Sequence, residues 1–245
     1  DETRDYTTLL VTGPKSRGLL SALSGANFSN DSFAWLTHQI IRIDGINCVA
    51  MRVSFTGELG WELHTPSGHS DKIYTLLRQK GADFNLKPFG MLALESMRLE
   101  KGYRSWKGDL TSDYNMFDAG LRRWVHFSKP DFVGRTALLA QKDAPARQFV
   151  TLGLDDPRDS DVPFGEAVYL SSVFSNPDGN TIAGLVLSGG YGHRTQTSIA
   201  LAVLEAGEDA TIGRELMIEV VGRPRKATIL AYGGIYDSDN TLLKG

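Results

Sequence analysis

Cysteine is almost absent from this sequence, and long apolar segments are lacking altogether. Cys48 is the only cysteine among 245 residues, which excludes an intrachain disulfide framework and fits a reducing compartment. The longest apolar stretches, such as residues 182–187, are far too short to span a bilayer. We therefore expect neither a disulfide scaffold nor a membrane partner.

The chain also lacks a large net charge of either sign. The formal net charge is −3, and the 26 basic residues are dispersed along the chain, so no nucleic-acid partner is expected. The histidines show no H-x3-H pairing and no cysteine lies near them, so no metal site is expected. The five histidines are His38, His64, His69, His126 and His193.

Common catalytic motifs are lacking as well. The sequence has no G-x-S-x-G element, and residues 12–15 lack the second glycine and the Lys-Ser/Thr ending of a P-loop. The glycine-rich segment 188–194 is not a dinucleotide fingerprint, because predicted strands lie on both sides of it. We predict no catalytic nucleophile within the chain, and Cys48 is interpreted as a buried core residue.

The composition that remains is typical of a globular protein, with 41% hydrophobic and 22% charged residues. Residues 6–11 have the pattern of a strand, and Pro14 suits the first turn of a helix that follows. Asp44-Gly45 is typical of a type I′ turn between strands 39–43 and 46–54. Helices are expected over residues 71–80, stopped by Gly81, over 90–101, stopped by Gly102, and over 133–141.

The pattern changes near Ala146, after which strands alone are predicted. They are short and separated by Gly, Pro, Asn and Asp, with a strong turn at residues 176–180. We therefore expect an α+β fold, with a ligand-binding domain over residues 1–145 and a small antiparallel β-barrel, or a sandwich, over residues 146–245. The predicted strands are 149–154, 167–170, 181–188, 199–204, 216–221 and 227–231.

Three segments could carry chemistry. In residues 52–63 two glycines open a strand and present Glu58 and Glu62 beside aromatic rings, which could hold a planar donor pair such as a pterin edge. In residues 94–106, Arg98 lies three residues after Glu95 on one helix side. In residues 188–194, glycines around Tyr191 could allow close approach of a ligand. Structural alternatives remain open: an exposed turn with Trp61 in the core, a surface Arg–Glu pair, and a bulged hairpin corner.

Taken together, four ordered motifs resemble the aminomethyltransferase (glycine-cleavage T-protein) family over about residues 5–140. Residues 10–17 resemble its L-x-G-P-x-A-R opening, and residues 52–62 its R-x-S/T-Y-x-G-E-x-G-x-E segment. Residues 96–104 resemble S-L-R-L-E-K-G-Y-R, and residues 132–138 resemble F-I/V-G-R-E-A-L. The versions found here look most like the C-terminal folate domains of dimethylglycine and sarcosine dehydrogenases.

The resemblance implies a tetrahydrofolate site. Glu62 matches the family's glutamate that holds the pterin's amide and amino edge, and Phe55 stands where a tyrosine is frequent. Leu94 replaces an arginine of the glycine-cleavage members, which argues against a lipoyl-carried substrate. The family's acidic residue beside the folate N10 would precede Asp1, so poor turnover of this chain alone is expected. The folate-binding residues that we predict are Phe55, Glu58, Glu62, Arg98, Tyr103, Trp106 and Tyr191.

The implied function is transfer of a one-carbon unit to tetrahydrofolate, in the cytoplasm or, in a eukaryote, the mitochondrial matrix. The expected partners are a small-molecule one-carbon donor and an amine-oxidising flavin domain or subunit. Two alternatives remain: a folate-dependent methyltransferase or demethylase, and a folate-binding module without turnover of its own.

Overall fold

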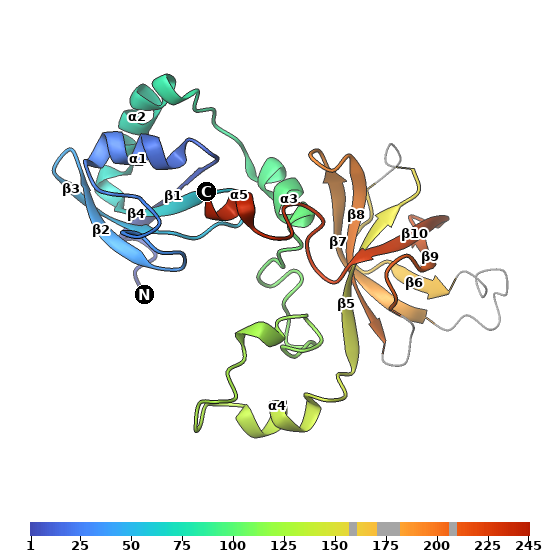
Figure 1. The fold of residues 1–245 in the computed structure, drawn as a ribbon. Coiled ribbons are helices and arrows are strands. Elements are labelled where there is room, and N and C mark those ends of the chain that lie inside the picture. The colour runs from blue at the N-terminus through green and yellow to red at the C-terminus, as the bar shows by residue number, and fades with distance from the viewer. Residues whose placement is uncertain (157–160, 171–181, 206–209) are drawn as a thin grey trace. The chain divides into compact units, whose positions relative to one another are not determined.

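The computed structural model describes residues 1–156, 161–170, 182–205 and 210–245 (Figure 1). The chain forms two compact units. Unit 1 comprises Asp1–Leu94 together with Asp239–Gly245, and unit 2 comprises Glu95–Ser238. This division by contacts falls inside a helix, whereas the expected boundary near Ala146 concerns a change in sequence pattern and stays a prediction.

Unit 1 is built on a four-stranded antiparallel sheet in the order β1-β4-β3-β2, with helices α1 and α2 on one face (Figure 1). Apolar side chains from that face pack with Leu19 and Leu20 of α1 and with Ile73 and Leu77 of α2. The elements are β1 (Tyr6–Thr12), α1 (Ser16–Ser24), β2 (His38–Ile43), β3 (Ile46–Met51), β4 (Gly60–Pro66) and α2 (Ser70–Gly81). Gly81 is the last residue of α2, so the helix ends where the sequence predicted.

The β2–β3 hairpin forms as the sequence predicts. Asp44 and Gly45 both adopt positive φ angles, 48° and 80°, as a type I′ turn requires. The strand after this turn ends at Met51 and not at Ser54. The glycines were expected to interrupt a strand, but Gly60 begins β4, where a Cβ atom would lie 2.9 Å from the Val11 carbonyl oxygen.

Unit 2 contains a closed antiparallel barrel in the order β10-β5-β8-β7-β6-β9, which confirms the expected α+β fold with a small barrel (Figure 1). Apolar side chains from all six strands fill its interior. In the described part of residues 149–231 no helix occurs, and the predicted turn at 176–180 lies outside the described residues. The strands are β5 (Arg147–Leu154), β6 (Ala167–Leu170), β7 (Ile182–Gly192), β8 (Thr197–Glu205), β9 (Glu215–Val220) and β10 (Arg223–Ala231).

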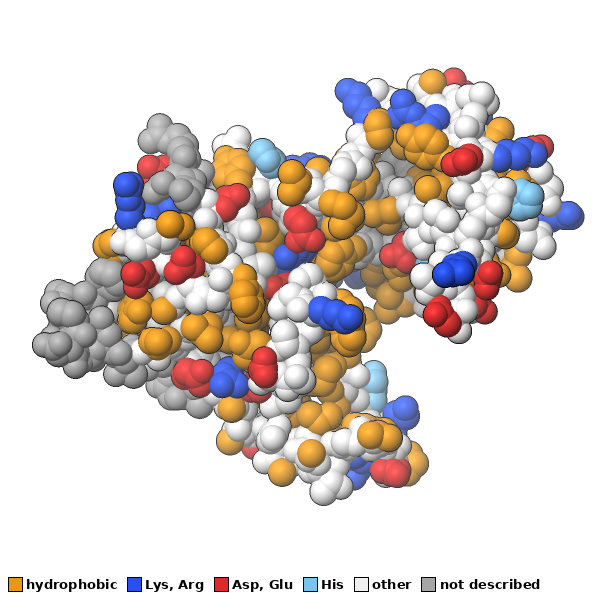
Figure 2. Space-filling model, turned by 180° about the vertical axis from the view of Figure 1, so that it is seen from behind, with side chains coloured by type: hydrophobic (Ala, Val, Ile, Leu, Met, Phe, Trp, Pro, Cys, Tyr) orange, Lys and Arg blue, Asp and Glu red, His pale blue; other side chains and the backbone are white. Residues whose placement is uncertain are grey.

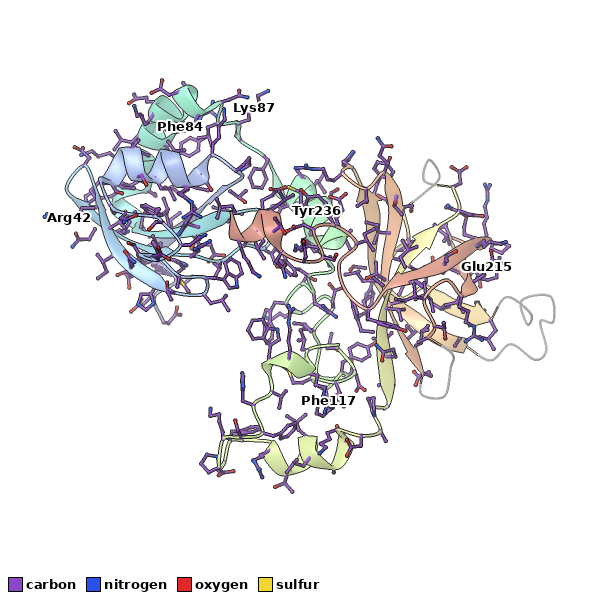
Figure 3. All side chains as sticks on the ribbon, viewed as in Figure 1. Arg42, Phe84, Lys87, Phe117, Glu215 and Tyr236 are labelled. Atoms are coloured by element: carbon purple, nitrogen blue, oxygen red, sulfur yellow. The ribbon has the colours of Figure 1, made fainter. Side chains whose placement is uncertain are left out.

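Helices and turns complete the two units. Helix α3 (Met91–Glu100) ends before Gly102, whose φ is +64°, and α4 (Arg135–Gln141) is the third expected helix. Short helices are η1 (Ser67–His69), η2 (Ala82–Phe84), η3 (Arg122–Trp124) and α5 (Thr241–Lys244). Phe84 of η2 packs over α1, where Gly18 leaves room for its ring (Figure 3). Among the described residues, no helix has the length and apolar character to cross a bilayer.

Candidate functional site

The loop between β3 and β4 is held to the end of β1 by hydrogen bonds. The hydroxyl groups of Thr12 and Thr56 lie 2.9 Å apart, and the Gly13 amide donates to the Leu59 carbonyl at 2.7 Å. Gly57 supplies the positive φ of +79° at which the loop turns. This framework holds Phe55 and Glu58, both half-buried, immediately before the strand that carries Glu62.

Arg52, which opens this loop, has a structural position. Its guanidinium is buried and donates to the Phe33 carbonyl at 2.7 Å and to the Lys244 carbonyl at 2.6 Å. Burial, and then the positive charge of Arg17, lowers the pKa of Arg52. Arg52 therefore fixes both the turn around Phe33 and the C-terminal helix within unit 1.

Trp61 and Glu62 point to opposite faces of β4. Trp61 is fully buried, with its ring centroid 5.1 Å from that of Phe28 and 6.0 Å from that of Phe33. The Glu62 side chain lies on the other face and is 33% exposed. The structural alternative for Trp61 is therefore the right one: its ring belongs to the core and cannot stack on a ligand held by Glu62.

His64 and Thr8 share the face of the sheet on which Glu62 lies. The Nε2 atom of His64 is 3.3 Å from Oε2 of Glu62, and its Nδ1 atom is 3.1 Å from the Thr8 hydroxyl. His64 was not among the site residues predicted from the sequence. The period-two pattern of a strand was the available signal, because residues 62 and 64 of one strand face the same side.

Arg98 lies in a network of ion pairs within unit 2. It is 4% exposed, and its Nε and Nη2 atoms each lie 2.7 Å from Glu95 Oε2. Its Nη1 atom donates to Asp109 at 2.6 Å, to the Ser188 hydroxyl at 3.0 Å and to the Tyr103 carbonyl at 3.1 Å. The expected Glu95 pair is present, but Arg98 is buried and not a surface residue. Its guanidinium organises the helix end, and contact with a ligand stays a prediction.

Asp109 is a site residue that sequence reasoning missed. It is fully buried and accepts hydrogen bonds from Arg98 and from the Ser105 amide, the latter at 2.7 Å. No local pattern pointed to it, because an aspartate in a turn is ordinarily exposed.

Tyr103 and Trp106 differ sharply in exposure. Burial raises the pKa of Tyr103, and the charge of Arg123 partly opposes that rise. Trp106 is 79% exposed in a turn where Lys107 has a φ of +64°. Trp106 is one of several large apolar residues whose side chains are exposed. Figure 2 shows hydrophobic side chains at the surface of one face of the molecule.

Arg104, which lies between Tyr103 and Trp106 in sequence, is a third residue that was not predicted. Its guanidinium carbon lies 3.6 Å from the centroid of the Phe149 ring, and its Nη1 donates to the Gly102 carbonyl at 2.9 Å. Burial, with a smaller contribution from Arg123, lowers the pKa of Arg104 to about 10. The arginine remains charged at neutral pH and packs against the barrel strand β5.

The glycines around Tyr191 serve packing within unit 2. A Cβ atom at Gly189 would lie 2.4 Å from the Val162 carbonyl oxygen, and one at Gly190 would lie 2.9 Å from Leu99. The Tyr191 carbonyl accepts a 2.6 Å hydrogen bond from Ser96. Strand β7 has a register shift between Val186 and Ser188, at the start of this segment, and Ser188–Gly192 then pair regularly with β8. The expected bulge is therefore present, but these residues lie in a strand and the hairpin corner follows them.

The predicted folate-binding residues thus fall into two groups. Within unit 1, the loop between β3 and β4 carries Phe55 and Glu58, and the strand β4 that follows carries Glu62. Within unit 2, Arg98 contacts Tyr103 directly, and the strand carrying Tyr191 is bonded to the same helix. The remaining predicted residue of unit 2, Trp106, follows in the exposed turn. Binding by each of the seven stays a prediction.

Comparison with known proteins defines the class. Residues 1–129 match the GCVT N-terminal domain, and residues 147–236 match the glycine cleavage T-protein C-terminal barrel domain. The chain therefore belongs to the glycine-cleavage T-protein (aminomethyltransferase) family.

Individual relatives include a dehydrogenase and an oxidase. Mitochondrial dimethylglycine dehydrogenase of Mus musculus is 31% identical, over 93% of this chain and 25% of the dehydrogenase. The 4-methylaminobutanoate oxidase (formaldehyde-forming) of Paenarthrobacter nicotinovorans is 32% identical, over 100% of this chain and 28% of the oxidase. The chain thus spans about a quarter of the length of these relatives.

A solved structure shares the fold. The glycine cleavage system aminomethyltransferase T from Bartonella henselae superposes with a TM-score of 0.78 at 22% identity, covering 92% of this chain and 58% of that one. At this identity the match supports the fold alone.

Proposed function

We propose that this chain binds reduced folate against the Phe55–Glu62 segment and acts in one-carbon transfer, as the folate module of an enzyme like dimethylglycine or sarcosine dehydrogenase. The observation that carries the proposal is the Glu62 carboxylate. It is one-third exposed on the outward face of β4, directly after a hydrogen-bonded loop that presents Phe55. Membership of the T-protein family supports the choice of folate as the ligand.

The residues present suit such a ligand. A carboxylate has about four lone-pair positions, enough to accept two N–H groups from the edge of a pterin and one from a protein neighbour. The ring of Phe55 offers an apolar contact and no hydroxyl hydrogen bond. When bound, tetrahydrofolate would supply the nitrogen atoms that accept the one-carbon unit. The chain's own contribution is to orient the pterin through Glu62 and to limit water near it.

The proposal extends to partners and location. A flavin domain or subunit that oxidises a methylated amine would supply the one-carbon unit, and the relatives named as dehydrogenase and oxidase support this pairing. We place the activity in the cytoplasm or the mitochondrial matrix. A folate-dependent methyltransferase and a binding module without turnover are the alternatives, and consumption of formaldehyde with tetrahydrofolate above the uncatalysed rate would separate a transferase from a binding module.

The binding proposal predicts that Glu62→Ala weakens tetrahydrofolate binding by about 1.5–3 kcal/mol, the scale of a hydrogen bond to a charged group. Isothermal titration calorimetry of both proteins measures this difference. Glu2→Ala is the matched control, because it removes an exposed glutamate from the same unit. Equal affinities of the wild type and Glu62→Ala would show that the segment is not the folate site.

A further inference from the structure

The outward face of the unit 1 sheet carries a short chain of polar side chains that ends at Glu62. Pairing of β1 with β4 places Thr8 opposite His64 and Leu10 opposite Glu62. Pairing of β3 with β4 places Val49 opposite His64 and Met51 opposite Glu62. His64 thus lies between a hydroxyl group on one strand and a carboxylate on its own strand, with aliphatic neighbours otherwise.

We propose that His64, oriented by Thr8, is a positioning residue that holds the Glu62 carboxylate for its ligand. The Thr8 hydroxyl is 3.1 Å from Nδ1 of His64, and this hydrogen bond fixes the orientation of the ring. Nε2 is 3.3 Å from Oε2 of Glu62. This distance places the imidazole against the carboxylate without a hydrogen bond between them, and the inference rests on the proposed role of Glu62 in folate binding.

The burial of the pair supports a role in orientation. The side chains of His64 and Glu62 are 28% and 33% exposed, so each is partly shielded while one side remains open. A glutamate on a strand has three flexible side-chain torsions, and fixing them before binding lowers the entropic cost of association. The carboxylate has about four lone-pair positions, which provides acceptors for a ligand with two neighbouring N–H groups.

Other charged side chains on this face are farther along the sheet. His38 of β2 pairs with Met51, which separates it from Glu62 by one strand. Arg42 lies at the other end of β2, opposite Asn47, and is labelled in Figure 3. His38 is therefore a matched control: it is a histidine on the same face, and it is exposed.

The test measures tetrahydrofolate affinity by calorimetry in the 245-residue chain, with circular dichroism as a check of folding. We expect His64→Ala to weaken binding about threefold to fivefold, the scale of a partly exposed ion pair. His64→Gln, whose amide group can donate to Glu62, should recover most of the loss. Thr8→Val should weaken binding in the same direction, and His38→Ala should leave it unchanged.

A double-mutant cycle distinguishes positioning from a general structural effect. In a Glu62→Gln background, His64→Ala should have little further effect, because its partner has lost its charge. An equal loss in both backgrounds would overturn the inference. The inference would also be overturned if His64→Ala bound tetrahydrofolate with unchanged affinity while Glu62→Ala bound it weakly. That outcome would leave the proposed function intact. If Glu62→Ala itself binds normally, both the proposed function and the inference are wrong.

Discussion

Asp109 and Arg98 show how much a single residue contributes to the second unit. Asp109 is fully buried, Arg98 is 4% exposed, and their charged atoms lie 2.6 Å apart. Removing one partner of a buried pair leaves an uncompensated charge, which is more costly than the pair itself is stabilising.

We predict that Asp109→Ala destabilises the protein by about 3 kcal/mol and that Asp109→Asn, which keeps an acceptor, costs less. The measurement is the urea dependence of unfolding, followed by circular dichroism. Asp143→Ala serves as the control, because Asp143 also forms an ion pair, at 3.8 Å from Lys142, but its side chain is 82% exposed. If Asp109→Ala and the wild type unfolded with the same midpoint urea concentration, this account of the pair would be contradicted.

Individual site residues were predictable only where a local pattern marked them. The i, i+3 spacing indicated the pair of Glu95 and Arg98, and it is present. The second acid on Arg98 comes from Asp109, eleven residues away, and a hydroxyl comes from Ser188, ninety residues away. Such contacts depend on the folded chain and have no signature in local spacing.

At the scale of elements, the end of α3 is fixed by a close approach of two backbones. Gly102 has a φ of +64°, and a Cβ atom there would lie 2.5 Å from the carbonyl carbon of Gly233 and from the Gly234 amide nitrogen. The Glu100 carbonyl accepts hydrogen bonds from Ile235 at 2.8 Å and from Tyr236 at 3.0 Å. The sequence indicated that Gly102 ends the helix, but not what the glycine packs against.

Gly102→Ala should therefore be destabilising by more than about 2 kcal/mol, because a left-handed conformation costs about 1 kcal/mol and the backbone clash adds to it. Gly222→Ala separates the two effects. Gly222 has a φ of +73° in the same unit, and nothing lies within 4 Å of its Cβ position. Thermal unfolding of the two variants measures the difference, and equal losses of stability would mean that the close approach contributes nothing.

At the scale of the whole molecule, the pattern of short strands broken by Gly, Pro, Asn and Asp predicted the barrel. Closure of six strands depends on pairings such as β10 with β5, which join residues far apart in sequence. Likewise, the final residues Asp239–Gly245 belong to unit 1, where Arg52 and Arg17 bind the Lys244 carbonyl. Strand and helix periodicity carries no information about which distant segments pack together, so the packing of the C-terminal residues into unit 1 was not predicted.

The central claim is that Glu62 of a T-protein family fold holds a folate, and a crystal structure of this chain with tetrahydrofolate tests it most directly. The account predicts the amide and amino edge of the pterin within hydrogen-bonding distance, about 2.7–3.2 Å, of the Glu62 carboxylate, with Phe55 in contact with the ligand. A bound folate whose pterin edge is held by other residues, with Glu62 facing only His64 and solvent, would contradict it.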